Sequence, residues 1–309
     1  MKIETTAGIL TDDAYNTMVQ NIMTVFNCKQ SDVTNINPIQ VGLSNMIFRF
    51  KIKHKGPSEF VYRNPGLGSE LLTDRGRETI IQSIVSAAGV DPTLIAMDAK
   101  EGWRISKYIQ HRDFDYHNIN DMVQAIMLIK KIHEIPCKVR WNFDVIKEAE
   151  RIEGYIPKTE YGKYECFEQI KNRCYRLYEY TKKDNIEKCI THGDCRDVNF
   201  LINDRECHLI DWEWGGFGDP GFDIGTYVCG GKHSQEEIER ILFTYFRRVP
   251  TKVEKRHYYA YIALSGWFYM NWTMLKEWKG QKIGILKELW HHYANEYSLK
   301  AIEMYEVNE

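Results

Sequence analysis

The sequence lacks any C-x-x-C pair, and its charges are nearly balanced. Its eight cysteines are dispersed over 309 residues, so neither a disulfide framework nor a zinc site of paired cysteines is expected. Dispersed, reduced and mostly buried thiols are typical of cytosolic proteins. The formal net charge of -2 provides no overall basic field for nucleic acid or an anionic membrane. We therefore expect a cytoplasmic protein that does not bind nucleic acid.

The sequence also has little that would insert into a membrane. Its first residues lack the basic-then-apolar layout of a signal peptide. The stretch 258–275 contains no charged residue and approaches the length of a membrane span. It nevertheless contains Ser265, Gly266 and Asn271, and it is rich in tyrosine and tryptophan rather than leucine. We interpret it as a buried helix that lines an aromatic site, and we expect no membrane insertion.

No internal repeat, low-complexity run or Pro/Gly-rich linker is present, and the first third of the chain has β-like periodicity. From Met46 to Lys53 apolar and polar residues alternate with period two, which indicates a half-buried strand. Apolar residues recur at helical spacing from Ile80 to Ala88, after a cap at Asp74. A helix is also expected over 11–26, and strands over 46–53, 59–63, 93–97 and 103–109. Residues 35–109 are thus expected to form a small sheet with one inserted helix.

After residue 110 the pattern becomes mainly helical. Helices are expected over 119–132, 167–180, 235–246 and 283–305, and a β-like segment at 189–211 interrupts them. A β-rich first lobe and a helical second lobe with a hinge near Tyr108 make a two-lobed α+β architecture. We place the two lobes at 1–109 and 110–309.

One part of the helical lobe carries a chemical pattern. It reads H-G-D-C-R-D-V-N-F-L over 192–201 and L-I-D-W-E over 209–213, with Asp194, Asn199 and Asp211 at its core. Phosphoryl transfer needs a carboxylate that orients the attacking hydroxyl and hard oxygen ligands that hold Mg²⁺ on ATP. Asp194 suits the first role, and Asn199 and Asp211 suit the second. The alternative is a polar loop beside a strand, but the whole string is far more specific than three polar residues.

The string resembles the H-[GN]-D-x-x-x-x-N and I-D-[WF]-E motifs of the choline/ethanolamine kinase and aminoglycoside phosphotransferase superfamily. The run G-D-P-G-F-D-I at 218–224 is similar to the G-D-P-x-x-D-[IL] segment of that superfamily. The resemblance extends from about Val41 to Trp272 and is densest between His192 and Ile224. It implies a protein-kinase-like fold and transfer of phosphate from ATP, with Mg²⁺, to a small molecule.

The resemblance also implies nucleotide-binding residues in the first lobe. A loop over the phosphates would lie at Gly42, Leu43, Ser44 and Asn45, although a glycine turn is a weak signal by itself. Arg63 stands where protein kinases place a strand lysine, and Glu78 would pair with it. The alternative for these two residues is an ordinary surface pair. Tyr108 and Ile109 fall where the hinge would carry the adenine.

Aromatic residues of the second lobe suggest which molecule accepts the phosphate. A quaternary ammonium donates no hydrogen bond, so its recognition relies on aromatic faces and nearby carboxylates. Tyr269 and Trp272 are three residues apart, share a helix face, and resemble the aromatic pair of choline kinases. Trp267 and Trp272 are five apart and point in different directions, and aromatic stripes are usually core. The candidate acceptor residues are Glu213, Trp214, Asp219, Trp267, Tyr269 and Trp272.

The motifs leave several acceptors open. Gly193 gives H-G-D, as in the aminoglycoside enzymes, whereas many choline kinases have asparagine there. Arg63 and the P-G-x-G run at 65–68 resemble the bacterial choline kinases of the LicA type. We favour an ATP- and Mg²⁺-dependent choline kinase that makes phosphocholine. The alternatives are a phosphotransferase for aminoglycosides, ethanolamine or thiamine, and a nucleotide-binding pseudokinase. A protein kinase would need an A-P-E-like motif, which we do not find. The sequence does not determine the oligomeric state.

Overall fold

The computed structural model describes residues 3–40, 45–53, 58–66 and 71–307. The chain divides into two compact units, one made of Met1–Asp113 with Leu201–Glu213 and the other of Phe114–Phe200 with Trp214–Glu309. The segment 201–213 thus belongs to the β-rich unit, although the sequence suggested the second lobe. The reason is local bonding, because the backbone N–H of Arg112 donates to the Ile202 carbonyl and Arg63 binds Asp211.

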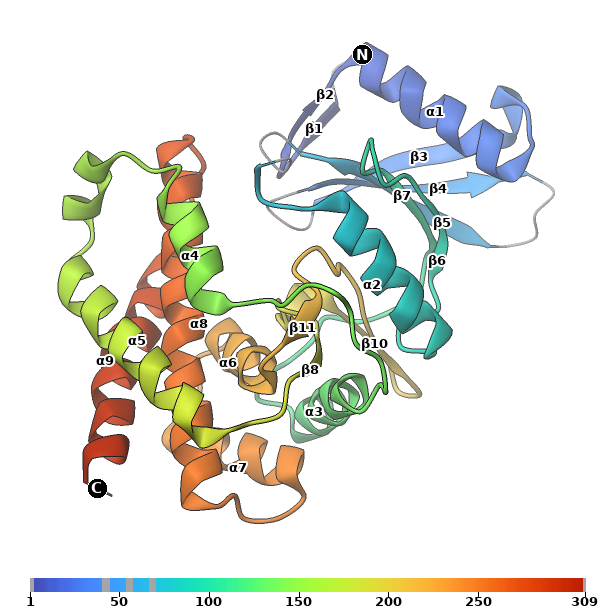
Figure 1. The fold of residues 1–309 in the computed structure, drawn as a ribbon. Helices are drawn as coiled ribbons and strands as arrows, with labels where there is room; N and C mark the ends of the chain where they lie inside the picture. Colours follow the sequence, from blue (N-terminus) through green and yellow to red (C-terminus); the bar gives the residue numbers. More distant parts are fainter. Residues whose placement is uncertain (1–2, 41–44, 54–57, 67–70, 308–309) are drawn as a thin grey trace. The chain divides into compact units, whose positions relative to one another are not determined.

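A five-stranded antiparallel sheet with strand order β3-β4-β5-β7-β6 forms the centre of the first unit (Figure 1). The strands are β3 Val33–Ile39, β4 Asn45–Ile52, β5 Glu59–Pro65, β6 Leu94–Met97 and β7 Arg104–Lys107. The expected alternation in β4 is confirmed, because Phe48, Phe50 and Ile52 are buried and Lys51 is exposed. Two β-hairpins complete this unit's strands, β1 Ile3–Thr5 with β2 Gly8–Leu10, and β9 Phe200–Ile202 with β10 Cys207–Leu209.

Helices α1 Asp12–Phe26 and α2 Arg75–Ala87 lie on opposite faces of this sheet (Figure 1). Side chains of successive residues in β5 point to opposite faces. Tyr62 therefore reaches α1, where its hydroxyl accepts a hydrogen bond from Asn21, and Arg63 reaches α2, where it pairs with Glu78. Both helices agree with the sequence, and the expected cap at Asp74 is confirmed, since its side chain accepts from the Arg77 N–H.

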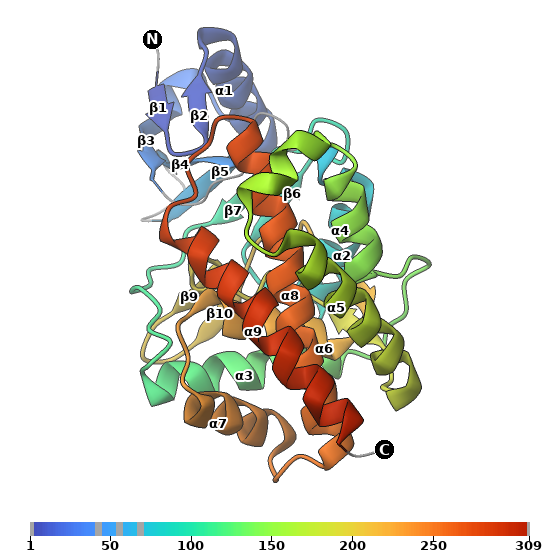
Figure 2. The ribbon, with the colours of Figure 1, turned by 90° about the vertical axis from the view of Figure 1, so that its left-hand side faces the viewer.

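The second unit is built around the long helix α8, Lys252–Trp278, which is buried over most of its length. Helices α9, α6, α4 and α5 pack against it (Figure 2). The helices of this unit besides α8 are α3 Ile119–His133, α4 Val145–Glu153, α5 Phe167–Thr181, α6 Pro220–Gly230, α7 Gln235–Phe246 and α9 Ile285–Glu306, and β8 Cys189–Thr191 pairs with β11 Gly216–Gly218. Four of these helices were expected, whereas α4 and α6 were not.

Close backbone packing explains two features of this unit. A Cβ at Gly266 would lie 2.6 Å from the Ala294 nitrogen of α9, so the glycine lets α8 and α9 approach closely. In α6, glycines lower the helix propensity, yet Gly225 lies so close to Ser265 and Tyr261 of α8 that no side chain would fit. Over the described part of the chain, no helix combines the length and apolar character that a bilayer crossing needs.

Candidate active site

The first unit contains a buried ion cluster around Arg63. One guanidinium nitrogen, Nη1, lies 2.6 Å from Glu78 Oε1 and 2.7 Å from Asp211 Oδ1. Arg75 also binds Glu78, at 2.9 Å. The side chains of Arg63 and Glu78 are 3% and 0% exposed, so the alternative of a surface pair is wrong. Arg63 is therefore a fixed cation with one carboxylate from α2 and one from the segment after β10.

The charges of this cluster are set by one another. Burial disfavours the Glu78 anion, but the charge and hydrogen bond of Arg63 outweigh burial and lower the pKa of Glu78 to about 2. Glu213 is half-buried and accepts a hydrogen bond from Thr73 at 3.2 Å. Burial and the carboxylates of Asp211 and Glu78 raise the pKa of Glu213. Asp211 adopts a φ of 69°, a left-handed conformation that aspartate tolerates better than most residues.

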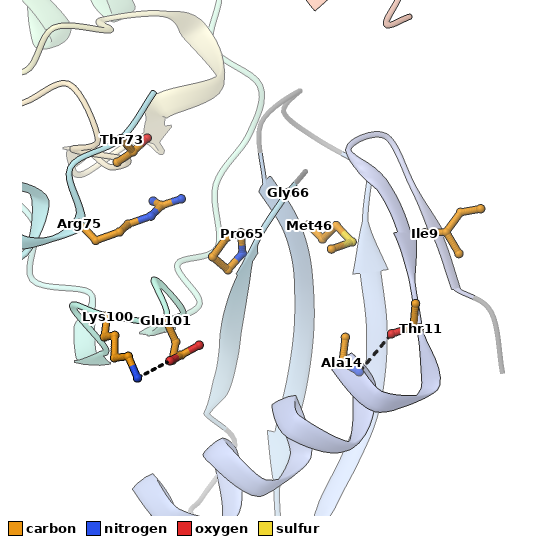
Figure 3. A pocket seen from close by; sticks show the side chains of 10 residues that line it. All are labelled: Ile9, Thr11, Ala14, Met46, Pro65, Gly66, Thr73, Arg75, Lys100 and Glu101. Atoms are coloured by element: carbon orange, nitrogen blue, oxygen red, sulfur yellow. Dashed lines mark hydrogen bonds and ion pairs between the residues drawn. The ribbon is translucent and has the colours of Figure 1, made fainter. Parts of the chain in front are cut away.

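A cavity of about 610 Å³ opens beside this cluster within the first unit. Figure 3 shows Arg75 and Lys100 on one side of it, and Ile9 and Ala14 on the other. Both cations have carboxylate partners, Arg75 in Glu78 and Lys100 in the adjacent glutamate. The cavity thus pairs an apolar wall from the N-terminal segment with a neutralised polar wall.

Of the expected phosphate loop, Gly42, Leu43 and Ser44 lie outside the described residues. Asn45 begins β4 and is buried, and its side-chain amide has no hydrogen-bond partner among the residues that the structure describes. At the expected hinge, the Arg49 guanidinium lies 3.9 Å from the centre of the Tyr108 ring. The Ile109 carbonyl lies 2.7 Å from His111 Nδ1.

In the second unit, Asp194 is the centre of a compact network. Asn199 Nδ2 donates to Asp194 Oδ2 at 2.9 Å and to the Asp194 carbonyl at 2.8 Å. Arg196 donates to both carboxylate oxygens, at 2.7 and 3.2 Å. The Tyr269 hydroxyl donates to Oδ1 at 2.5 Å. The structure thus brings Asp194, Asn199 and Tyr269 together from a loop and from α8, and it adds Arg196, which the sequence reasoning missed.

The network keeps Asp194 ionised although it is buried. Burial alone would raise the pKa of its carboxyl, but the charge of Arg196 and the hydrogen bonds from Arg196 and Tyr269 outweigh burial and lower this pKa. The amide of Asn199 donates through Nδ2, so its Oδ1 is the atom available to a hard cation. Asp211 Oδ1 binds Arg63, which leaves Oδ2. Amide and carboxylate oxygens of this kind suit Mg²⁺.

Asp223, near the start of α6, binds the backbone of the loop that carries Asp194. Its carboxylate accepts the backbone N–H of His192 at 2.8 Å and of Gly193 at 2.7 Å, and it lies 3.0 Å from His133 Nε2. Burial disfavours the Asp223 anion, but these partners lower its pKa. The G-D-P-x-x-D segment could have drawn attention to Asp223, because it places a lone aspartate in an otherwise apolar helix.

Aromatic rings flank the Asp194 network. The Tyr269 ring stacks on Trp290 of α9, with centroids 4.7 Å apart, and Trp272 meets the same indole edge-on at 5.9 Å. The Arg196 guanidinium lies 5.5 Å from the Tyr269 centroid and 5.7 Å from that of Trp290. Trp290 was not identified from the sequence, since it lies in a different helix. We call Tyr269, Trp272 and Trp290 the aromatic cluster.

Other expected acceptor residues have separate surroundings. Trp267 is fully buried against Phe167, with centroids 5.0 Å apart, whereas Trp272 contacts Trp290. Trp214 packs on Phe268 at 5.0 Å. Asp219 caps α6 and binds His257 Nε2 at 3.0 Å through both carboxylate oxygens. Glu213 lies in the first unit.

His257 is a fully buried imidazole between two carboxylates. Its Nδ1 lies 3.1 Å from Asp184 Oδ2, and its Nε2 binds Asp219. Burial would lower the pKa of His257, but the two aspartates outweigh burial and raise it to about 9. The Asp219 carboxylate is thus used inside the fold, as a helix cap and as a partner of a buried cation.

Comparison with known proteins identifies the family of this chain. A family model of choline/ethanolamine kinases matches residues 36–262. The chain belongs to the choline/ethanolamine kinase family. Among its relatives, the protein LicA of Haemophilus influenzae is 24% identical over 242 residues, which cover 73% of this chain and 88% of LicA.

Solved structures show the fold. The choline kinase LicA from Streptococcus pneumoniae superimposes with a TM-score of 0.75 at 18% identity, covering 96% of this chain and 100% of that one. A spectinomycin phosphotransferase in complex with ADP and spectinomycin gives 0.54 at 13% identity, covering 88% and 94%. The shared fold confirms the expectation of a kinase-like α+β architecture, and the family match confirms that of a small-molecule kinase.

Proposed function

We propose that this kinase transfers the γ-phosphate of ATP to the hydroxyl of choline and releases phosphocholine. The observation that carries the proposal is the aromatic cluster next to an ionised aspartate. Tyr269 joins the two, because its ring stacks on Trp290 while its hydroxyl binds Asp194. Aromatic faces attract a quaternary ammonium through their electron-rich surfaces. The Arg196 guanidinium, which already lies over two of these rings, indicates that the cluster is suited to a cation.

In the proposed reaction Asp194 orients the acceptor hydroxyl and accepts its proton as the bond to phosphorus forms. Its lowered pKa keeps the carboxylate ionised, so it can accept a hydrogen bond from the hydroxyl before transfer. Such positioning contributes much of the rate enhancement in phosphoryl transfer. Arg63 supplies a fixed cation for the ATP phosphates, and Glu78 holds its side chain in place.

We further propose Asn199 and Asp211 as the residues that would supply oxygen ligands to Mg²⁺. When bound, the ion neutralises charge on the phosphates of ATP. Asn45 would lie near these phosphates, and Tyr108 and Ile109 would contact the adenine. Trp272 and Tyr269 would contact the ammonium.

The test is an ADP-release assay with Mg-ATP and a methylation series of acceptors: ethanolamine, its N-methylated and N,N-dimethylated forms, and choline. Contact with aromatic faces predicts that kcat/KM rises with each methyl group. A primary ammonium would favour hydrogen-bond acceptors instead, so an optimum at ethanolamine would refute the choline assignment. Turnover of kanamycin or thiamine without choline would identify a different acceptor class.

Two variants of one loop test the catalytic assignment. Asp194→Asn removes the anion and should lower kcat by roughly 100- to 10,000-fold, as for loss of a general base. Asp197→Asn is the matched control, because this residue is a half-buried carboxylate in the same loop without an assigned role. Full activity of the Asp194→Asn enzyme would exclude Asp194 as the base. No turnover of any acceptor by the wild type would favour the pseudokinase.

A further inference from the structure

Three residues from separate segments of the second unit form a cluster away from the Asp194 network. His117 immediately precedes the cap of α3, His233 lies in the connection between α6 and α7, and Glu237 is in the first turn of α7. One nitrogen or oxygen atom of each lies within 4.8 Å of the others. His117 Nδ1 and Glu237 Oε1 are 2.7 Å apart. Two imidazoles and a carboxylate are a donor set that binds zinc in proteins.

His233 has a feature that hydrogen bonding within the fold does not explain. Its side chain is buried, with 8% of the residue exposed, and neither ring nitrogen has a hydrogen-bond partner among the described residues. The ring is held between Tyr116, edge-on at 5.4 Å, and Tyr227, stacked at 5.8 Å. A buried imidazole without partners is unfavourable. A metal ion would satisfy one of these nitrogens.

We propose that His117, His233 and Glu237 form a binding site for a divalent transition-metal ion of the zinc type, with water in the fourth position. Glu237 would bind through Oε1, since its Oε2 accepts the backbone N–H of Ser234 at 2.7 Å. Tetrahedral zinc places its ligand atoms about 3.4 Å from one another. His117 has to move slightly away from Glu237 to reach that spacing, and its exposed side chain, at 56%, is free to do so.

The site would also act on the loop that carries Asp194. The residue before His117 is Tyr116, whose hydroxyl accepts the backbone N–H of Asp197 at 2.7 Å. Asp197 lies between Asp194 and Asn199 in the sequence. A metal bound to His117 would therefore stabilise the start of α3, the start of α7 and, through Tyr116, this loop. The proposal does not depend on which acceptor the kinase uses.

The experiment is a metal titration of the full-length, reduced and metal-free protein. Zn²⁺ is titrated in competition with a chromophoric chelator, and Co²⁺ is followed by its visible absorption, which is intense for a tetrahedral site. We expect one ion per chain. His117→Ala and Glu237→Gln should each weaken binding by more than roughly tenfold, since even outer-sphere partners of metal ligands contribute that much. Glutamine retains the capping interaction of Glu237, so this variant should fold.

His292→Ala is the control, because it removes an exposed histidine of α9 outside the cluster and should leave binding unchanged. The eight cysteines are another potential source of zinc binding. Equal affinity of the wild type and both ligand variants would assign any bound zinc to the cysteines and overturn the proposal. The absence of a tetrahedral cobalt spectrum in the wild type would overturn it as well.

Discussion

Gly193, which distinguishes H-G-D from the H-N-D of many choline kinases, should be intolerant of any side chain. Its φ is +84°, and a Cβ would lie 2.7 Å from Trp214 Cβ and 2.8 Å from the Trp214 carbonyl oxygen. The left-handed backbone costs about 1–2 kcal/mol for alanine, and overpacking costs about 1–3 kcal/mol more. We expect Gly193→Ala to lower the free energy of unfolding by about 2–5 kcal/mol, the sum of these terms.

Urea unfolding of matched variants separates the two causes. Gly89 has a similar φ of +67°, but a Cβ there would meet nothing within 4 Å. Gly89→Ala should therefore cost only the backbone part, about 1–2 kcal/mol. Gly193→Asn adds the same Cβ, but asparagine tolerates positive φ. This variant should therefore lose stability through overpacking against Trp214 alone. An equal loss in Gly89→Ala and Gly193→Ala, or a neutral Gly193→Asn, would show that crowding by Trp214 is not the cause.

Three further variants test buried charges. The stability difference between the wild type and His257→Gln should be fully present below pH 6.5 and be lost as the pH rises through about 9, because the folded-state pKa of His257 is raised. Over that range the free energy of unfolding in urea should change by about 3 kcal/mol. A difference that does not depend on pH would contradict this prediction. Tyr269→Phe removes a hydrogen bond to the Asp194 carboxylate and should cost about 1.5–3 kcal/mol in unfolding free energy; an unchanged value would mean that this bond contributes nothing. Glu78→Gln leaves Arg63 without its charged partner on α2. It should lower the free energy of unfolding by about 3–5 kcal/mol and raise the KM for ATP. An unchanged KM, measured by ADP release, would show that Arg63 does not take part in nucleotide binding.

Elements with strong local periodicity were predictable from the sequence. The alternation of β4 and the helical spacing of α2, α3, α5 and α7 appear where expected, because hydrophobic periodicity and caps act within a few residues. Helix α6 was not predicted, since Gly221, Gly225 and Gly230 lower its propensity. It forms because its glycines allow contact with α8 at Tyr261 and Ser265, which is a tertiary effect that overrides local preference.

The candidate active site likewise combines residues that the sequence identified and residues that only the tertiary structure brought together. Asp194 and Asn199 were identified from one motif, and the short loop between them is enough to bring their side chains together. Trp290 was missed because nothing near it in the sequence marks it, and Arg196 because a charged loop residue is ordinarily solvated. Asp219 was a candidate for the acceptor site, but its carboxylate caps α6 and binds His257.

The sequence by itself determined the chemical groups of this kinase and most of its secondary structure, because motif spacing and periodicity are local properties of the chain. Only the tertiary structure decided which groups meet. It paired Arg63 with both Glu78 and Asp211, placed Trp290 against Tyr269, and gathered His117, His233 and Glu237. Such contacts join residues far apart in the chain, and they depend on how closely helices and strands can pack.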